Sequence, residues 1–324
     1  MNTAYPIKLL IAATCALAAA TASAQGYPAR PIRIVVPQLP GGGNDTVARL
    51  MSQKLSASFK QQVVADNRPG AGGMIGADIV AKSAPDGYTL LLGNVATLAI
   101  IPNIQKKPPY DPLRDFEPVS LIASAPLLVV VHPSLPVASI KQLIALARAK
   151  PGSLNYASNG IGSSTHLANE MFNMMTGVKM VHVPYKGLSA AVTDILAGQV
   201  QLMFSSAVAM LPHVKSGRLR AIAMTGAKRS SVIPEVPTVA ESGVPDFEAG
   251  SWYGILAPAG TARAIVDTLN REIVAATRSQ EIQERLVFEA VIPIGSTPEE
   301  FSAHIKKEHA RIGKVIKASD AKFD

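Results

Sequence analysis

Two polar loops, one in each half of the chain, contain the residue types best suited to binding chemistry. The first is Gly41-Gly42-Gly43-Asn44-Asp45, which follows a β-branched run over 32–37 and precedes an apolar-periodic segment. This order predicts a strand, a loop of bare backbone and the start of a helix. A ligand can approach the N–H groups of the glycines, and the helix start adds unpaired donors and a partial positive charge. The pattern predicts a cradle for a carboxylate or phosphate, with a plain helix cap as the alternative.

The second loop repeats this order with different residues. It runs from Asn159 to Thr165, between an expected strand and an expected helix. Ser163, Ser164 and Thr165 add hydroxyl groups, each of which can donate to a carboxylate. Ordinary helix capping is the alternative use of these residues. Two such junctions predict two lobes that hold one anion across a cleft.

Ser164 and His166 also admit a catalytic interpretation, with the serine as nucleophile and the histidine as base. The local sequence Gly160-Ile161-Gly162-Ser163-Ser164 lacks the G-x-S-x-G elbow of hydrolases, and no acid is identifiable as the orienting third group. We therefore predict no catalytic residue and no enzyme. An exported serine hydrolase that uses Ser164 or Ser163 with His166 is the alternative.

Neither a cofactor site nor a metal site is predicted. The segment 70–76 resembles a dinucleotide fingerprint, but its third glycine is displaced and the next strand, which ends at Leu92-Gly93-Asn94, has no terminal acid. A structural use of these glycines is the better interpretation. The histidines show no metal-ligand spacing, and His304 and His309 are expected on a solvated C-terminal helix.

The composition is that of a globular protein with an anionic ligand. The chain has 324 residues, of which 48% are hydrophobic and 17% charged, enough for about two domains. A formal net charge of +8 favours anionic ligands in general. Nucleic acid is not an expected partner, because the basic residues form no stripe and only 5% of residues are aromatic.

The N-terminus has the pattern of an export signal. Lys8 is its only charge, an apolar run covers 9–20, and Ala22-Ser23-Ala24 is an A-x-A cleavage site. We therefore expect residues 1–24 to be a cleaved signal peptide. The only cysteine, Cys15, lies in that segment, so no disulfide and no thiol nucleophile are expected in the mature chain.

From residue 32 onward, strands and helices alternate. Expected strands at 32–37, 62–66 and 88–92 enclose expected helices at 45–58 and 73–83, which is a βαβαβ series with parallel strands. A second series covers 154–205. The long apolar run 120–132 is expected to cross between lobes, and 250–257 to return. The predicted domains are 25–124 plus 250–324 for the first lobe, and 125–249 for the second.

Several long motifs carry a resemblance to a known family. They are YPARPIRIVVPQLPGGGNDTVAR, NRPGAGGMIGADIVAKSAPDGYTLLLG, HVPYKG and EVPTVAESGVPDFEAGSWYGILAPAG, and they lie across the whole mature chain. Together they resemble the Bug family of periplasmic solute receptors, which serve tripartite tricarboxylate transporters. The resemblance implies a type II periplasmic-binding-protein fold, with two α/β lobes that close on a small carboxylate. It also implies a monomer in the periplasm that works with the large and small membrane subunits of a transporter.

The resemblance also implies site residues. In the family, the βα loops of the two lobes hold one carboxylate, and the loop after HVPYKG lies at the cleft. The matching positions here, with the end of the third strand, are Gln38, Gly41, Gly42, Gly43, Asn44, Asp45, Asn94, Ser158, Asn159, Gly162, Ser163, Ser164, Thr165, His166, Tyr185, Lys186 and Gly187.

One departure from the family pattern concerns the ligand. Many members of the family have a sequence similar to MFDN at the position where this chain has Met203-Phe204-Ser205-Ser206. We include Ser205 among the expected site residues, and the absence of an aspartate there argues against an amino-acid ligand. A receptor that reports ligand occupancy to a signalling partner is a further alternative to transport.

Overall fold

The computed structural model describes residues 26–41, 43–288 and 290–318. The expected signal peptide, Cys15 and Gly42 therefore lie outside the described residues. Within the described part of the chain, no helix is both long and apolar enough to cross a membrane.

A mixed sheet of ten strands runs through the whole protein. Its main path, from one edge to the other, is β2 (Val63–Asn67), β1 (Ile32–Val36), β3 (Thr89–Asn94), β9 (Gly250–Pro258), β4 (Phe116–Val131), β7 (Leu202–Ser206), β5 (Asn155–Ser158) and β6 (Val181–Pro184). Two further strands, β8 (Arg220–Met224) and β10 (Ile292–Pro293), also pair with β4. The three strands at each end are parallel, as the βαβ patterns predict, whereas the pairs that involve β9 or β4 are antiparallel.

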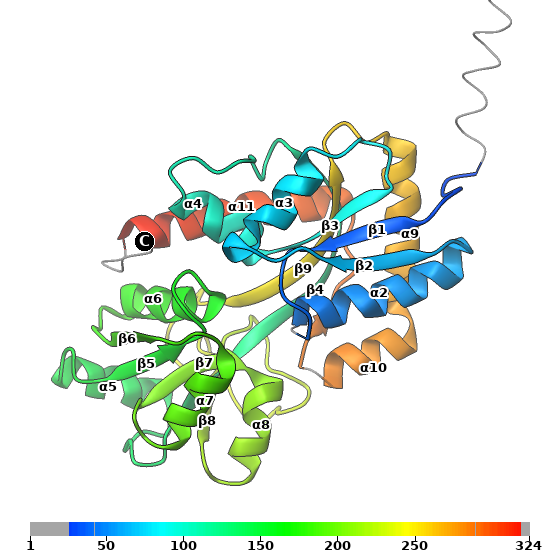
Figure 1. Cartoon of the computed structure of the whole chain (residues 1–324). Coiled ribbons are helices and arrows are strands. Elements are labelled where there is room, and N and C mark those ends of the chain that lie inside the picture. Colours follow the sequence, from blue (N-terminus) through cyan, green and yellow to red (C-terminus); the bar gives the residue numbers. More distant parts are fainter. Residues whose placement is uncertain (1–25, 42, 289, 319–324) are drawn as a thin grey trace, which may run out of the picture.

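The strand β4 belongs to both halves of this sheet. Its residues 116–126 pair with β9, and its residues 127–131 pair with β7. The sheet therefore passes from one half of the protein to the other along β4 and β9, and Figure 1 shows the two halves above and below these strands. We call the half around β1, β2 and β3 the first lobe, and the half around β5, β6, β7 and β8 the second lobe.

Helices cover both halves of the sheet. Those of the first lobe are α2 (Gly43–Phe59), α3 (Met74–Ala81), α4 (Ile101–Ile104), α9 (Arg263–Arg278), α10 (Gln280–Phe288) and α11 (Pro298–Ala318), with the short turns η1 (Ala71–Gly73) and η2 (Ala96–Ile100). Those of the second lobe are α5 (Ile140–Ala149), α6 (Ser164–Thr176), α7 (Leu188–Leu196) and α8 (Ala207–Lys215). In α9 the buried residues Val266, Leu269 and Ile273 form one apolar stripe, the pattern of a helix that covers a core.

The glycine segment that leads into α3 and includes Gly76 in its first turn has the structural use that the sequence predicts. A Cβ atom at Gly76 would lie 2.8 Å from the backbone oxygen of Arg68 and 2.9 Å from the Cα atom of Pro37. Only a glycine permits this close approach of helix and strand.

The C-terminal helix α11 is not solvated, so that expectation is wrong. Its residues Phe301, Ile305 and Ile312 are almost fully buried and belong to a core cluster with residues of both lobes. His304 lies edge-on to Trp252, with ring centroids 4.9 Å apart, and His309 contacts Asn103. The helix therefore buries an apolar stripe, and the two histidines flank it in half-buried positions.

Candidate ligand-binding cleft

A cavity of about 480 Å³ lies between the two lobes. It is next to β4 and β9, the paired strands that pass from one lobe to the other and that we call the crossing strands. This volume is within the range of about 300–1,000 Å³ typical of small-molecule sites. The residues that line it are Gly41, Gly43, Asn44, Thr46, Ala125, Pro126, Leu127, Asn159, Ser164, Thr165, Leu188, Ser206, Ala207, Val208, Ala209, Ser251, Tyr253, Ala290 and Val291. They come from both lobes and from the crossing strands.

Four helices begin in this lining. Gly43 opens α2, Ser164 opens α6, Leu188 opens α7 and Ala207 opens α8. The first N–H groups of a helix have no partner within it and carry a partial positive charge. No lining side chain among the described residues is ionisable at neutral pH. The electrostatics of the cavity therefore favour an anion through backbone dipoles and not through side-chain cations.

A buried carboxylate holds the loop of the first lobe. Oδ2 of Asp45 accepts hydrogen bonds from the backbone N–H of Gly41 at 3.0 Å and from Nε of Arg49 at 2.9 Å. Burial alone would raise the pKa of this carboxyl, but the hydrogen bonds from Arg49 and Gly41 outweigh it and hold the pKa below its usual value. Asp45 does not line the cavity, so its charge closes the loop and does not face a ligand.

The next residues of this loop are fixed from the strands behind it. A Cβ atom at Gly43 would lie 2.6 Å from the hydroxyl oxygen of Tyr253, so only a glycine fits there. Nδ2 of Asn94 donates to Oδ1 of Asn44 at 2.7 Å, while Oδ1 of Asn94 accepts from the backbone N–H of Thr97. The buried Asn94 thus orients the side chain of Asn44. Asn44 lines the cavity, and Asn94 does not.

The loop of the second lobe is held by its own hydroxyl groups. Oγ of Ser163 accepts from the backbone N–H of His166 at 3.2 Å and donates to the carbonyl oxygen of Gly160 at 2.7 Å. Oγ1 of Thr165 accepts from the backbone N–H of Asn159 at 2.9 Å. These bonds cap α6 and fix the loop in one conformation before a ligand arrives.

Two stacked histidines support this loop from behind. The rings of His166 and His182 are 3.8 Å apart between centroids and inclined by only 10°. Nδ1 of His166 accepts from the backbone N–H of Gly162 at 3.2 Å, and Nε2 of His182 lies 2.6 Å from Oγ of Ser158. Burial, and secondarily the neighbouring His182, lowers the pKa of His166 to about 3. The stack is therefore neutral at physiological pH.

Comparison with known proteins identifies the family. Residues 47–320 match the model of the tripartite tricarboxylate transporter family receptors. This chain belongs to that family. It is similar to the protein BugT of Bordetella pertussis, with 42% identity over 306 residues that cover 94% of each chain.

Solved structures of receptors in this family have the same fold. R. palustris Rpa4515 with adipate has a TM-score of 0.79 and 39% identity, covering 90% of this chain and 98% of the other. MatC from Rhodopseudomonas palustris with bound malate has a TM-score of 0.75 and 31% identity, and the match covers 90% of this chain and 100% of the MatC chain. The predicted fold class, a type II periplasmic-binding-protein fold with two α/β lobes around a ligand cleft, is confirmed. The protein is a solute-binding receptor of this family and not an enzyme.

The cavity of about 480 Å³ between the lobes, which we call the receptor cleft, is lined by six of the residues that the sequence predicts for the site: Gly41, Gly43, Asn44, Asn159, Ser164 and Thr165. The other described candidates do not line it: Gln38, Asp45, Asn94, Ser158, Gly162, Ser163, His166, Tyr185, Lys186, Gly187 and Ser205. Several of these lie one layer behind the lining. The Tyr185 hydroxyl, for example, donates to Asp194 at 2.7 Å, and Ser205 is fully buried in β7.

Sequence reasoning missed the start of α8 and the turn before β10. Ser206 caps α8 by accepting a hydrogen bond from the backbone N–H of Ala209, and no helix was expected after residue 205 in this lobe. A serine directly after a strand was the signal that could have revealed it. The residues Ala290 and Val291 gave no such signal. Tyr253, which was not among the expected site residues, also lines the cavity.

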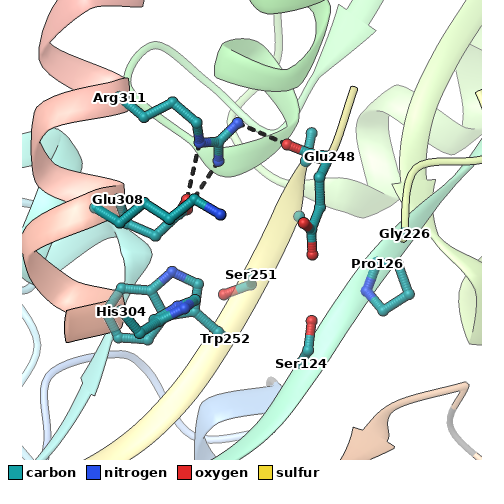
Figure 2. A pocket seen from close by; sticks show the side chains of 12 residues that line it. Ser124, Pro126, Gly226, Glu248, Ser251, Trp252, His304, Glu308 and Arg311 are labelled. Carbon is teal, nitrogen blue, oxygen red and sulfur yellow. Dashed lines mark hydrogen bonds and ion pairs between the residues drawn. The ribbon is translucent and has the colours of Figure 1, made fainter. Parts of the chain in front are cut away.

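A second, smaller pocket lies against the same crossing strands. It shares Pro126 and Ser251 with the receptor cleft and is lined further by Trp252, Glu248 and residues of α11. Figure 2 shows these side chains around it. Its volume of about 80 Å³ is well below that of a small-molecule site, so the larger cavity is the candidate.

Proposed function

We propose that this receptor captures a small carboxylate between its lobes in the periplasm and delivers it to the membrane subunits of a tripartite tricarboxylate transporter. One observation carries the proposal. Four helix N-termini, one from the first lobe and three from the second, open into a cavity whose described lining has no ionisable side chain. The similar receptors solved with adipate and with malate support a carboxylate as the ligand class.

We propose that six residues make the direct contacts to the carboxylate. The backbone N–H groups of Gly43 and Thr165 and the side chains of Asn44, Asn159 and Ser164 supply the donors. The N–H of Gly41 is bonded to Asp45, so Gly41 contributes only the close approach that its missing side chain permits. Gly42, which stands between Gly41 and Gly43 in the sequence, remains a predicted site residue. The remaining candidates around these loops act as supports, as the bonds of Asp45, Asn94 and Ser163 illustrate.

Neutral donors suit a receptor that must also exist empty. A buried arginine would leave an uncompensated charge in the cleft whenever no ligand is bound, at a cost of several kcal/mol. Backbone N–H groups at helix starts remain partly hydrated in the open cleft and become strong donors when closure excludes water.

Isothermal titration of ligand-depleted protein against a carboxylate panel tests the proposal. The panel contains adipate, malate, citrate and benzoate, with an uncharged amide of each size as a negative probe. We expect saturable binding of at least one carboxylate and none of the amides. Asn44→Ala should weaken that binding about tenfold or more, because a hydrogen bond to a charged group is lost. Asn155→Ala, at the start of β5 and outside the cavity lining, is the matched control. Failure of the folded protein to bind any carboxylate would refute the proposal.

We further propose that residues 1–24 are removed on export and that the mature receptor is a monomer with lobes at 25–124 plus 250–324 and at 125–249. The switch of β4 from β9 to β7 after residue 126 supports these boundaries. N-terminal sequencing of periplasmic protein should begin at Gln25, and light scattering should give the mass of one chain. Loss of carboxylate uptake by cells on deletion of the gene would support delivery to a transporter, whereas unchanged uptake would favour signalling.

A further inference from the structure

The lining of the cleft has a polar part and an apolar part. The loop residues and helix starts around Asn44 and Ser164 are polar, and Ser206, Ser251 and Tyr253 add hydroxyl groups, whereas a second group has only hydrocarbon side chains. This second group is Ala125, Pro126, Leu127, Leu188, Ala207, Val208, Ala209, Ala290 and Val291. It comes from the crossing strand β4, the starts of α7 and α8, and the turn before β10. The apolar part is therefore built from both lobes, as a surface that closes around a ligand would be.

One member of this apolar group is unusually exposed. Val208 retains 38% of its surface exposure although it lies in the first turn of α8, where its neighbour Ala207 is 2% exposed. Because Val208 lines the cavity, part of that exposed hydrocarbon faces the space a ligand would fill. An apolar ligand group would remove this surface from water, and a hydroxyl group packed against the Val208 side chain would lose part of its hydration without a partner on that side.

We propose that the ligand is a carboxylate with an unsubstituted apolar chain or ring of about four or more carbon atoms, which lies against Val208, Val291 and Leu127. This inference rests on the proposed function and specifies its ligand. The starts of α2 and α6, with their polar loops, hold the carboxylate, and the apolar group excludes ligands whose carbon skeleton carries several hydroxyl groups. A cavity of about 480 Å³ leaves room for such a skeleton.

Two matched series of ligands test the inference by titration calorimetry. In the first, succinate, adipate and suberate, and likewise butanoate, hexanoate and octanoate, differ only in the number of methylene groups. Affinity should rise with length in the series that binds, by up to roughly fourfold per buried methylene. In the second, adipate is compared with galactarate, the same six-carbon diacid with four hydroxyl groups. Galactarate should bind at least tenfold more weakly.

A pair of valine variants assigns the effect to the apolar group. Val208→Thr replaces a methyl by a hydroxyl at nearly constant volume and should weaken suberate binding about threefold or more. Val287→Thr makes the same change on α10 at a valine that is 37% exposed and outside the cavity lining, so it should leave binding unchanged. Equal binding of adipate and galactarate, or an affinity that is flat or falls with chain length, would overturn the inference while carboxylate binding itself stands. Absence of all carboxylate binding would refute the proposed function and this inference with it.

Discussion

The guanidinium group of Arg311 donates to the backbone carbonyl oxygen of Glu248 at 2.6 Å. Arg311 lies on α11 of the first lobe, and Glu248 lies in the segment that returns from the second lobe just before β9. Two further donors of Arg311 pair with both carboxylate oxygens of Glu308, each at 2.8 Å (Figure 2). The C-terminal helix is thereby tied to the second lobe beside the crossing strands.

Removal of this arginine should destabilise the protein. Arg311→Ala leaves the Glu308 carboxylate, whose side chain is 11% exposed, without its partner and frees the Glu248 carbonyl oxygen. Because the Arg311 side chain is itself 29% exposed, solvent screens part of the loss, and we expect the free energy of unfolding to fall by about 1–3 kcal/mol. Urea denaturation followed by circular dichroism measures it.

The control for Arg311 is an exposed arginine with two ion pairs. Arg263 pairs with Asp267 and Glu299, and all three side chains are more than half exposed. Arg263→Ala should therefore leave the denaturation midpoint unchanged within error. Equal shifts of the denaturation midpoint for the two variants would mean that the contacts of Arg311 with Glu308 and Glu248 add no stability beyond that of an exposed ion pair.

The close approach of Gly43 to Tyr253 makes a specific prediction for binding. In Gly43→Ala, the new methyl group would lie 2.6 Å from the tyrosine hydroxyl oxygen, so the loop or the ring must move. Tyr253 is only 7% exposed, which leaves the ring little freedom. We expect at least a tenfold loss of carboxylate affinity with a loss of stability below about 2 kcal/mol, within the range for an overpacked site.

Relief of this clash provides the control. Tyr253→Phe removes the oxygen atom that the methyl group would meet, so the double variant Gly43→Ala/Tyr253→Phe should recover most of the affinity that Gly43→Ala loses. The single variant Tyr253→Phe measures any direct contribution of the hydroxyl group. A double variant as weak as the sum of both single variants would refute the steric explanation.

Local sequence signals predicted most of the fold. The first βαβαβ series is one example, since the expected strands at 32–37, 62–66 and 88–92 correspond to β1, β2 and β3. The helix α8 was not predicted. Pro212 lies inside it, and packing of the buried Met210 and Leu211 maintains the helix despite the proline. Tertiary contacts thus override a local signal.

The sequence predicted those parts of the site in which glycines or helix-capping residues stand at the ends of strands. Glycines and hydroxyl residues at strand ends identified the two polar loops, because few other residue types permit bare backbone or cap a helix. Tyr253 reaches the cleft through the pairing of β9 with β3, in which it lies opposite Asn94. Ala290 and Val291 reach it through the turn that leads into β10. Such long-range placements leave no trace in the spacing of residues along the chain.

The stacked histidines behind the second loop should make the stability depend on pH. The pKa of His166 is about 3 in the folded protein and near 6.5 in an unfolded chain, and burial also lowers the pKa of His182. Between these values the unfolded chain binds more protons than the folded one, so stability rises with pH. The full contribution is present above about pH 6.5 and is lost as the pH falls toward 3. The slope is at most about 1.4 kcal/mol per pH unit for each histidine.

A replacement that keeps the local hydrogen bond isolates this effect. In His166→Asn, the amide oxygen can still accept from the backbone N–H of Gly162, but no group with a lowered pKa remains at that position. Urea denaturation at pH 7.5, 6.0 and 4.5 should show a smaller loss of stability on acidification for this variant than for the wild type. His213→Asn, on α8 and outside the stack, is the matched histidine control. Parallel pH profiles for the wild type and His166→Asn would show that the stacked ring is protonated without penalty, and the neutral stack would then not be what holds the second loop.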